Sequence, residues 1–325
     1  MKILLVDPPC QRFMGFYRFY FPLGLSYLAA TLQRSGHEVI IYDAEHDTSC
    51  ISPSMKETSS RHQHYLNALT NDTHPVWEEF SKILADFKPN IVGISALTVK
   101  LASAIKLASI TKSYNQKIIV VLGGEHVTVR PKDALHKNVD YIISGEGELA
   151  LLKLVRELEN KESPRKVISG HLISELDILP IPALKCLQNE KSYRPIDMGL
   201  MVTARGCPHS CSFCSLSSIW GKKVRFHSIT RTITEIKMRM ERYGTKYFSF
   251  RNGTFTQNRN RTIDFCHRLI EERLDIKWEC LTRVDTVDSE LLDLMQKAGC
   301  STIRIGVESG SNDSLKYMNK GINKE

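Results

Sequence analysis

Three cysteines stand close together in this chain, and their spacing is the strongest chemical signal in the sequence. Cys207, Cys211 and Cys214 lie in the segment CPHSCSFC, directly after a predicted strand. Thiolates at this spacing can hold one corner of an iron–sulfur cube. Zinc favours a fourth ligand, and His209 lies between the first two cysteines, where it does not easily turn inward with them. Three protein ligands would leave one iron open for a substrate or cosubstrate.

The rest of the composition is that of a globular protein from a reducing compartment. The chain has 325 residues, of which 42% are hydrophobic and 25% charged, and nine are cysteines. An odd cysteine count and an apolar run of only four residues before Asp7 argue against a disulfide framework and a signal peptide, so we expect a cytoplasmic protein. No apolar stretch is long enough to span a bilayer. The net charge of +8 is spread along the chain, so we expect a small-molecule substrate and no nucleic acid.

Strands that are apolar throughout alternate with amphipathic helices over residues 1–160. Such strands are covered on both faces, which predicts an α/β fold with a flavodoxin-like, doubly wound parallel sheet. A ligand of this fold lies at the carboxyl ends of the strands, near the point where the strand order reverses. The predicted strands are 2–6, 37–45, 90–97, 117–124 and 139–148.

A second alternation of strands and helices begins after a proline-containing segment. We predict that residues 161–197 are a linker and that residues 198–325 form the second domain. Four parallel strands form a curved sheet but do not close a barrel, so this domain is expected to be an incomplete barrel. The three cysteines follow its first strand. The predicted strands are 198–206, 246–251, 276–281 and 301–307.

The cysteine segment resembles the C-x3-C-x2-C motif of the radical S-adenosylmethionine (SAM) superfamily, including the aromatic Phe213 before the last cysteine. The resemblance implies that Cys207, Cys211 and Cys214 hold a 4Fe–4S cluster whose open iron binds the amino and carboxylate groups of SAM. It also implies cleavage of SAM to methionine and a 5′-deoxyadenosyl radical, with an electron donor such as flavodoxin or ferredoxin. Such chemistry belongs to the cofactor, and the protein positions it.

Two further strand ends resemble SAM-binding elements of the same superfamily. The segment IRIGVESG resembles the element that meets the SAM ribose, and Glu308 and Ser309 are its candidates because a carboxylate can accept from both ribose hydroxyls. The segment ECLTRVD resembles the preceding element, in which Arg283 would pair with the SAM carboxylate. The alternative for Arg283 is a local salt bridge with Asp285.

The second strand of this domain departs from the superfamily pattern. Where relatives usually carry acidic residues or a glycine-rich turn near the SAM amino group, this chain has FSFRNGTFT. The Asn252 side chain or a backbone carbonyl could still accept from the ammonium group. Arg251 would repel that group if it pointed inward.

The first 160 residues resemble the cobalamin-binding domain that is fused to many radical SAM proteins. Glycines at the strand ends would let a flat macrocycle or its nucleotide tail approach the backbone, and the alternative is that they only make tight turns. Polar side chains at the same ends would contact the cofactor. The implied cobalamin-binding residues are Ser95, Thr98, Gly123, Gly124, His126, Gly145, Glu146 and Gly147.

One variant of the cobalamin family carries an Asp-x-His-x-x-Gly loop whose histidine binds cobalt. This chain reads Asp7, Pro8, Pro9, Cys10 and Gln11 after its first strand, with no histidine. We therefore expect cobalamin with its own base displaced and without that histidine ligand. His126 is an alternative contact near the site.

The segment FMGFYRFYF, residues 13–21, follows the first strand and holds six aromatic residues and Arg18. So apolar a loop is not expected to stay in water. It would either pack between the domains or roof the cofactor or substrate cavity, and the sequence leaves both alternatives open.

The resemblance spans nearly the whole chain and implies a cobalamin-dependent radical SAM enzyme that transfers a methyl group to an unreactive carbon. A cobalamin-linked radical cyclase or rearrangement enzyme is the nearest alternative, because it uses the same cofactors. An inactive fragment or a cofactor-binding protein is the alternative of another class. We expect truncation at the carboxyl terminus, because the family barrel has six strands and only four are found here.

Overall fold

The computed structural model describes residues 1–17, 19–50, 57 and 60–324. The chain forms two compact units. Unit 1 comprises Met1–His171 with Leu179–Tyr193, and unit 2 comprises Leu172–Ile178 with Arg194–Glu325. Among the described residues, no helix has the length and apolar character needed to cross a membrane.

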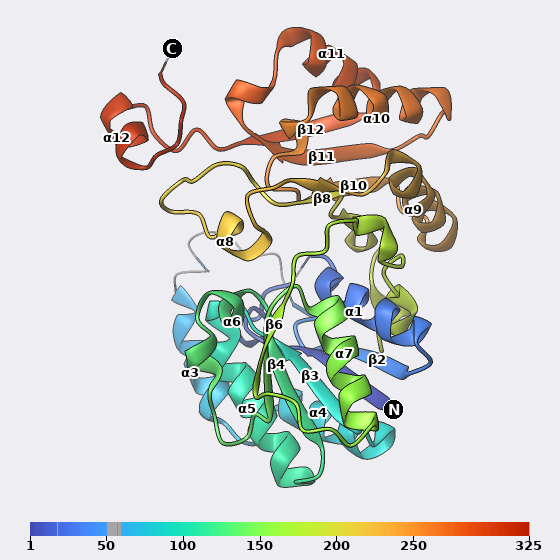
Figure 1. Ribbon diagram of the computed structural model, residues 1–325, viewed down its shortest axis with the longest axis vertical. Coiled ribbons are helices and arrows are strands. Elements are labelled where there is room, and N and C mark those ends of the chain that lie inside the picture. The colour runs from blue at the N-terminus through green and yellow to red at the C-terminus, as the bar shows by residue number, and fades with distance from the viewer. Residues whose placement is uncertain (18, 51–56, 58–59, 325) are drawn as a thin grey trace. The chain divides into compact units, whose positions relative to one another are not determined.

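A six-stranded, wholly parallel sheet forms the centre of unit 1 (Figure 1). Its order is β2-β1-β3-β4-β5-β6, so the direction of winding reverses between β1 and β3. This confirms the flavodoxin-like parallel sheet. The strands are β1 Lys2–Asp7, β2 Glu38–Asp43, β3 Ile91–Ser95, β4 Ile119–Gly123, β5 Tyr141–Gly145 and β6 Val167–Gly170.

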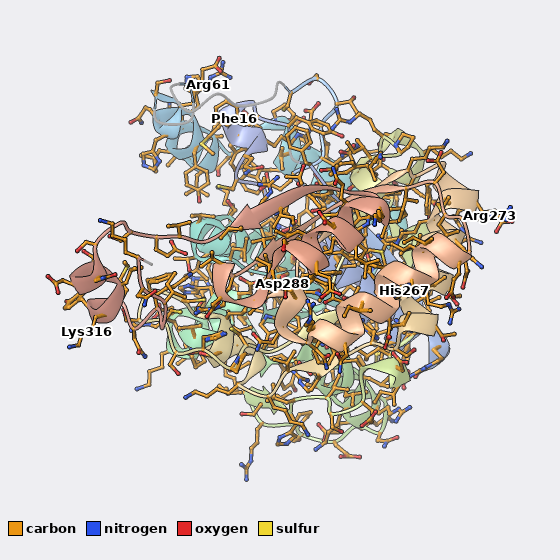
Figure 2. The ribbon with its side chains drawn as sticks, turned by 90° about the horizontal axis from the view of Figure 1, so that it is seen from above. Phe16, Arg61, His267, Arg273, Asp288 and Lys316 are labelled. Atoms are coloured by element: carbon orange, nitrogen blue, oxygen red, sulfur yellow. The ribbon has the colours of Figure 1, made fainter. Side chains whose placement is uncertain are left out.

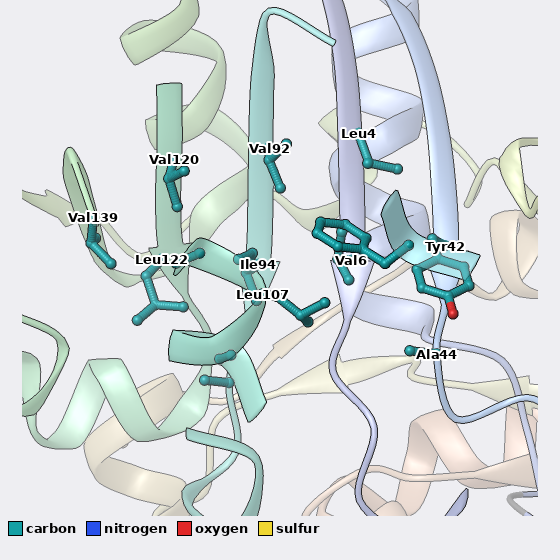
Figure 3. Close-up of a cluster of buried hydrophobic side chains, with 14 of the residues drawn as sticks. Leu4, Val6, Tyr42, Ala44, Val92, Ile94, Leu107, Val120, Leu122 and Val139 are labelled. Carbon is teal, nitrogen blue, oxygen red and sulfur yellow. The ribbon is translucent and has the colours of Figure 1, made fainter. Parts of the chain in front are cut away.

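Both faces of this sheet are buried, as strands without polar alternation predict. Leu4 and Val6 join one large cluster of buried side chains (Figure 3). Ile3 and Leu5, which point to the opposite face, are equally inaccessible. The helices of unit 1 are α1 Leu23–Arg34, α3 His62–Thr70, α4 Pro75–Phe87, α5 Leu101–Tyr114, α6 Glu125–Val129 and α7 Gly147–Glu159.

The predicted linker contributes to unit 1 at two places. Strand β6 pairs with β5 from Ile142–Val167 to Gly145–Gly170 and forms one edge of the sheet. Farther along, the Tyr193 hydroxyl donates to Asp43 Oδ2 at 2.7 Å, and the Tyr193 ring stacks on His46 with ring centroids 3.9 Å apart. The first sheet therefore has one strand more than the five expected.

Unit 2 contains a four-stranded parallel sheet of order β12-β11-β10-β7. An aromatic cluster of Phe250, Phe255, Phe265 and Trp278 packs beneath its helices, with ring centroids 5.2–5.7 Å apart. The strands are β7 Leu200–Met201, β10 Tyr247–Phe250, β11 Lys277–Thr282 and β12 Cys300–Ile305. The helices are α8 Leu216–Trp220, α9 Ile229–Tyr243, α10 Arg259–Glu271, α11 Ser289–Lys297 and α12 Asn312–Tyr317.

The first strand predicted for this unit, 198–206, is divided in two. Only β7 joins the parallel sheet, while β8 (Ala204–Arg205) pairs antiparallel with β9 (Arg225–Phe226). Asn252 explains the division, because its Oδ1 accepts from the backbone N–H groups of Thr203 and Ala204 at 2.8 and 3.2 Å. The Asn252 side chain thus accepts the hydrogen bonds that a backbone carbonyl of a sheet partner would otherwise accept, and the segment after Met201 leaves the parallel sheet.

Candidate active site

The cysteine loop occupies the span between β8 and β9. Gly206 begins it at φ +103°, and a Cβ there would lie 2.3 Å from the Lys223 carbonyl oxygen, so only glycine fits. Within the loop, the Cys214 N–H donates to the Cys211 carbonyl at 3.1 Å. The Cys207 N–H donates to the Gly221 carbonyl, also at 3.1 Å.

The three thiols fit a thiolate-bound iron–sulfur cluster by their chemistry. All three cysteines are free of disulfides; Cys207 and Cys211 are half-buried and Cys214 is exposed. In the described part of the chain, no group of three or more His, Cys, Asp or Glu side chains is arranged to hold a metal ion. The loop therefore presents three soft, accessible donors that a cluster would gather.

Arg283 lies beside these thiols, at the end of β11. Its guanidinium donates from Nε and Nη2 to the two Asp285 oxygens, each at 2.8 Å, and from Nη2 to the Lys320 carbonyl at 2.9 Å. The pKa of Arg283 is raised, chiefly by its bond to Asp285 and also by the charges of Cys211 and Cys207. The alternative expected for Arg283, a local salt bridge with Asp285, is thus found, and pairing of Arg283 with the SAM carboxylate remains a prediction.

Glu308 and Phe213 meet at a common cation. Lys320 Nζ lies 3.0 Å from Glu308 Oε1 and 5.6 Å from the centroid of the Phe213 ring. Glu308 adopts φ +66°, in the left-handed region, three residues after Ile305, the last residue of β12. Ser309 uses its Oγ to accept from the Ser311 N–H at 3.1 Å. The sequence did not predict a role for Lys320, because no motif links it to Glu308, which lies 12 residues earlier in the chain.

Arg251, which follows the second strand β10, forms an ion pair with Glu279 of the neighbouring strand β11. Arg251 Nη2 lies 3.1 Å from Glu279 Oε1, and Arg304 Nη2 lies 3.0 Å from Glu279 Oε2. Glu279 also accepts from the Ser249 hydroxyl at 2.6 Å. Its pKa is lowered by these bonds and by the two guanidiniums, against the effect of burial. Asn252, 3% exposed, has its amide engaged with Thr203 and Ala204.

In unit 1, two of the predicted cobalamin-binding residues, Thr98 and His126, contact each other. Thr98 Oγ1 lies 3.0 Å from His126 Nδ1, and Ser95 ends the neighbouring strand β3. His126 is buried, and its Nε2 lies 3.4 Å from Asp133 Oδ2. The imidazole is therefore held through Nδ1, whereas its buried Nε2 makes no hydrogen bond in the described part of the chain.

The strand-end glycines pack tightly against unit 1 itself. A Cβ on Gly124, at φ +105°, would lie 2.7 Å from the Ala96 nitrogen and 2.9 Å from Ser95 Oγ. A Cβ on Gly145, at φ +97°, would lie 2.3 Å from the Gly170 carbonyl. At these two positions the close neighbours alone require glycine. Gly123 and Gly147 are less crowded, because the nearest atoms to an added Cβ would lie at 3.4 and 3.2 Å. Glu146, which lies between Gly145 and Gly147 in the chain, is buried.

A buried ionic group lies where the winding of the first sheet reverses. Lys100 Nζ lies 2.8 Å from Asp7 Oδ1 and 3.0 Å from Glu45 Oε1, and the side chains are at most 8% exposed. Glu45 Oε2 also accepts from the backbone N–H groups of Cys10 and Arg12. Sequence reasoning missed this group; Asp7 at the end of a buried strand was the one available signal.

The aromatic segment 13–21 is largely buried; Arg18 lies outside the described residues. Phe13 packs against Trp77 of α4, with ring centroids 5.2 Å apart, and belongs to the main cluster of unit 1. The Arg61 guanidinium lies 5.2 Å from the Phe16 ring centroid (Figure 2). Phe19 is 43% exposed. A role for this segment above a cofactor remains a prediction.

Known proteins match the two halves of the chain separately and the whole chain together. Residues 16–155 match the B12 binding domain, and residues 201–325 match the Radical SAM superfamily. An uncharacterized methyltransferase of Pyrococcus horikoshii is 34% identical over 99% of this chain and 68% of its own length. An anaerobic magnesium-protoporphyrin IX monomethyl ester cyclase of Rubrivivax gelatinosus is 29% identical over 79% of this chain and 50% of its own length.

A solved structure shares the fold of both units. The radical SAM methyltransferase TsrM of Kitasatospora setae, with tryptophan and a SAM analogue bound, superposes with a TM-score of 0.73 at 16% identity. The match covers 99% of this chain and 62% of that protein. Across these three proteins, the present chain spans from half to about two thirds of the relative's length.

Proposed function

This chain belongs to the radical SAM proteins that carry a B12-binding domain, and from that premise we propose that it transfers a methyl group to an unactivated carbon of a small molecule. The cofactors of the family are a 4Fe–4S cluster, SAM and cobalamin. When bound, they would supply the electron, the 5′-deoxyadenosyl radical and the methyl group. The observation that carries the proposal is the loop of three free thiols beside Arg283.

In unit 2, Cys207, Cys211 and Cys214 would hold the cluster, and Arg283 and Glu308 would bind SAM. Asp285 orients Arg283 through Nε and Nη2, so a SAM carboxylate would bind through the remaining nitrogen or take the place of Asp285. Glu308 is held by Lys320 and could accept from a ribose hydroxyl through its second oxygen. Phe213 and Ser309 would border the same space.

Asn252 fits a positioning role in unit 2. Its amide fixes the chain at Thr203 and Ala204, just before the cysteine loop begins. The Arg251 guanidinium pairs with Glu279, a carboxylate that it shares with Arg304, and this pairing reduces the expected repulsion of a SAM ammonium group. These pairings support SAM binding in spite of the departure from the superfamily pattern.

In unit 1, we propose cobalamin at the carboxyl ends of β3, β4 and β5. Ser95, Thr98, Glu146 and the turns at Gly123 and Gly147 would approach it, while Gly124 and Gly145 shape the backbone. The segment after β1 holds no histidine, which favours cobalt without the histidine ligand of the Asp-x-His-x-x-Gly loop, while His126, whose buried Nε2 makes no hydrogen bond among the described residues, stays the alternative contact. Hydroxocobalamin added to the full chain should therefore show the absorbance of the base-off form.

A cobalamin-linked radical cyclisation is the second candidate, because of the likeness to the Rubrivivax cyclase. We further infer a reducing, cytoplasmic setting and a protein reductant such as flavodoxin or ferredoxin. The domain division proposed with this function is 1–160 for cobalamin, 161–197 as connection and 198–325 for radical SAM chemistry.

The test is anaerobic reconstitution with iron, sulfide and hydroxocobalamin, followed by incubation with SAM and a reductant. We expect 5′-deoxyadenosine, and with a methyl acceptor also S-adenosylhomocysteine. Formation of 5′-deoxyadenosine alone in the presence of a true substrate would favour the cyclase. If the loaded protein forms no 5′-deoxyadenosine, the proposed function is wrong.

A further inference from the structure

The turn that follows α12 contacts the cysteine loop on both sides of Cys211. The Ser212 N–H donates to the Met318 carbonyl at 2.9 Å, and Asn319 Nδ2 donates to the Ser210 carbonyl at 2.9 Å. These two bonds flank Cys211 in the chain. Together with the bond from the Cys207 N–H to the Gly221 carbonyl and the contact of His209 with Gln257, they hold the loop within unit 2.

The same turn also contacts the residues proposed to bind SAM. The Lys320 carbonyl accepts from Arg283 Nη2 at 2.9 Å, and Lys320 Nζ pairs with Glu308 Oε1 at 3.0 Å. Three consecutive residues, 318–320, therefore bond to the cysteine loop, to the end of β11 and to the segment after β12. No other role for this turn follows from the motifs in the sequence.

Asn319 gives the turn its shape as well as one of its bonds. It adopts φ +49°, a left-handed conformation that asparagine tolerates better than most residues, and its N–H donates to the Lys316 carbonyl at the end of α12. The helix itself is anchored by Leu315, which is 2% exposed. The turn is thus built on a fixed helix end.

We propose that Asn319 is a positioning residue that sets the cysteine loop against Arg283 and Glu308, so that a SAM molecule can reach the cluster and both side chains at once. The effect on SAM binding rests on the proposed function, whereas the positioning of the cysteine loop by Asn319 does not. Asn319 itself touches neither cofactor. Its loss should loosen the loop and weaken SAM binding, while the three thiols still collect iron.

The test compares Asn319→Gly and Asn319→Asp with Arg273→Gly. Glycine keeps the left-handed turn and removes the amide, and aspartate keeps the shape but replaces the donor by an acceptor. Arg273 is the matched control, because it also ends a helix of unit 2 at φ +50° and lies away from the turn after α12 (Figure 2). Thermal unfolding should confirm that all three variants fold.

Two measurements separate the outcomes. In the metal-free chain, hydrogen exchange at the Ser212 amide should rise roughly threefold to tenfold in both Asn319 variants, which is the effect of one hydrogen bond. In the reconstituted chain, iron content should be unchanged and the SAM dissociation constant should rise by a similar factor. Arg273→Gly should leave both quantities unchanged.

Unchanged exchange at Ser212 in both Asn319 variants would overturn the proposal, whatever the cofactor chemistry. Faster exchange with unchanged SAM affinity would overturn the link to SAM. If the wild-type chain takes up iron but no SAM, the proposed function fails, whereas the exchange measurement still decides whether Asn319 holds the loop.

Discussion

The carboxyl ends of the two parallel sheets are organised in opposite ways. In unit 1, Lys100, Asp7 and Glu45 form buried ion pairs that tie together the ends of three neighbouring segments. In unit 2, the corresponding end carries an exposed loop with three thiols, and a few backbone bonds hold it. Buried charges hold the first end, whereas hydrogen bonds of an exposed loop hold the second.

The strongest test of this contrast is removal of the thiols. Cys207, Cys211 and Cys214 changed together to alanine should reduce bound iron from about four per chain to near zero, because these three thiols are the proposed protein ligands of the cluster. The fold of unit 2 should persist, since the thiols are not part of its core. Iron and acid-labile sulfide analysis after anaerobic reconstitution measures this. Cys50→Ala is the control and should keep its iron; a loaded cluster in the triple variant would contradict the assignment.

The buried ion pairs of unit 1 should show a large effect on stability. Lys100→Met leaves two carboxylates buried without their cation, at a cost of about 3–5 kcal/mol in the free energy of unfolding. Lys106→Met is the matched control on the same segment, because its partner Asp72 is 82% exposed, and it should cost less than about 1 kcal/mol. Urea unfolding measures both. Equal effects of the two changes would mean that burial does not distinguish these pairs.

Acid should weaken unit 2 through His227. Burial, with Arg231 nearby, lowers the pKa of His227 to about 4, from an ordinary 6.5. The unfolded chain therefore binds a proton that the folded chain does not, and stability is lost as the pH falls from about 6.5 to 4, by up to about 3 kcal/mol. His227→Asn should flatten this pH dependence of unfolding, whereas the exposed His267→Asn should not. A slope that persists in His227→Asn would assign the effect to another group.

The smallest expected effect separates crowding from backbone conformation at the strand ends. Gly124→Ala faces both a positive φ and three atoms within 2.9 Å, while Gly36→Ala faces only a positive φ, with nothing within 4 Å. Both should destabilise unit 1, Gly124→Ala by more than about 1 kcal/mol and by more than Gly36→Ala. Thermal unfolding of the two variants gives the difference. Equal losses would show that the packing around Ala96 gives way.

Sequence patterns predicted the strands that are apolar throughout and missed the short strands β6 and β9. The strands β1, β3 and β4 are apolar throughout and were found, because their neighbours cover both faces. Strand β6 has four residues, and Val167 within it is 43% exposed, so nothing in its pattern distinguished it from a linker. The division of strand 198–206 depends on the side chain of Asn252, which the local sequence does not reveal.

The site shows the same limit in a different form. The three cysteines can be recognised from their spacing in the sequence, because they lie within eight residues of a single loop. Lys100 and Asp7 are 93 residues apart, and each reads as an ordinary surface charge until the fold brings them together. Glu279 likewise reads as exposed, although it is 3% accessible and pairs with Arg251.

The late position of β6 and Tyr193 in the chain has a consequence for synthesis on the ribosome. The first sheet cannot gain its edge strand until residue 170 has left the exit tunnel, and Asp43 cannot gain its hydroxyl partner until Tyr193 has followed. Cys207 leaves the tunnel shortly after Tyr193, because it follows Tyr193 by only 14 residues. The first sheet of a nascent chain would therefore be completed at about the time when the first thiol emerges, while strands β10 to β12 of unit 2 are still to follow.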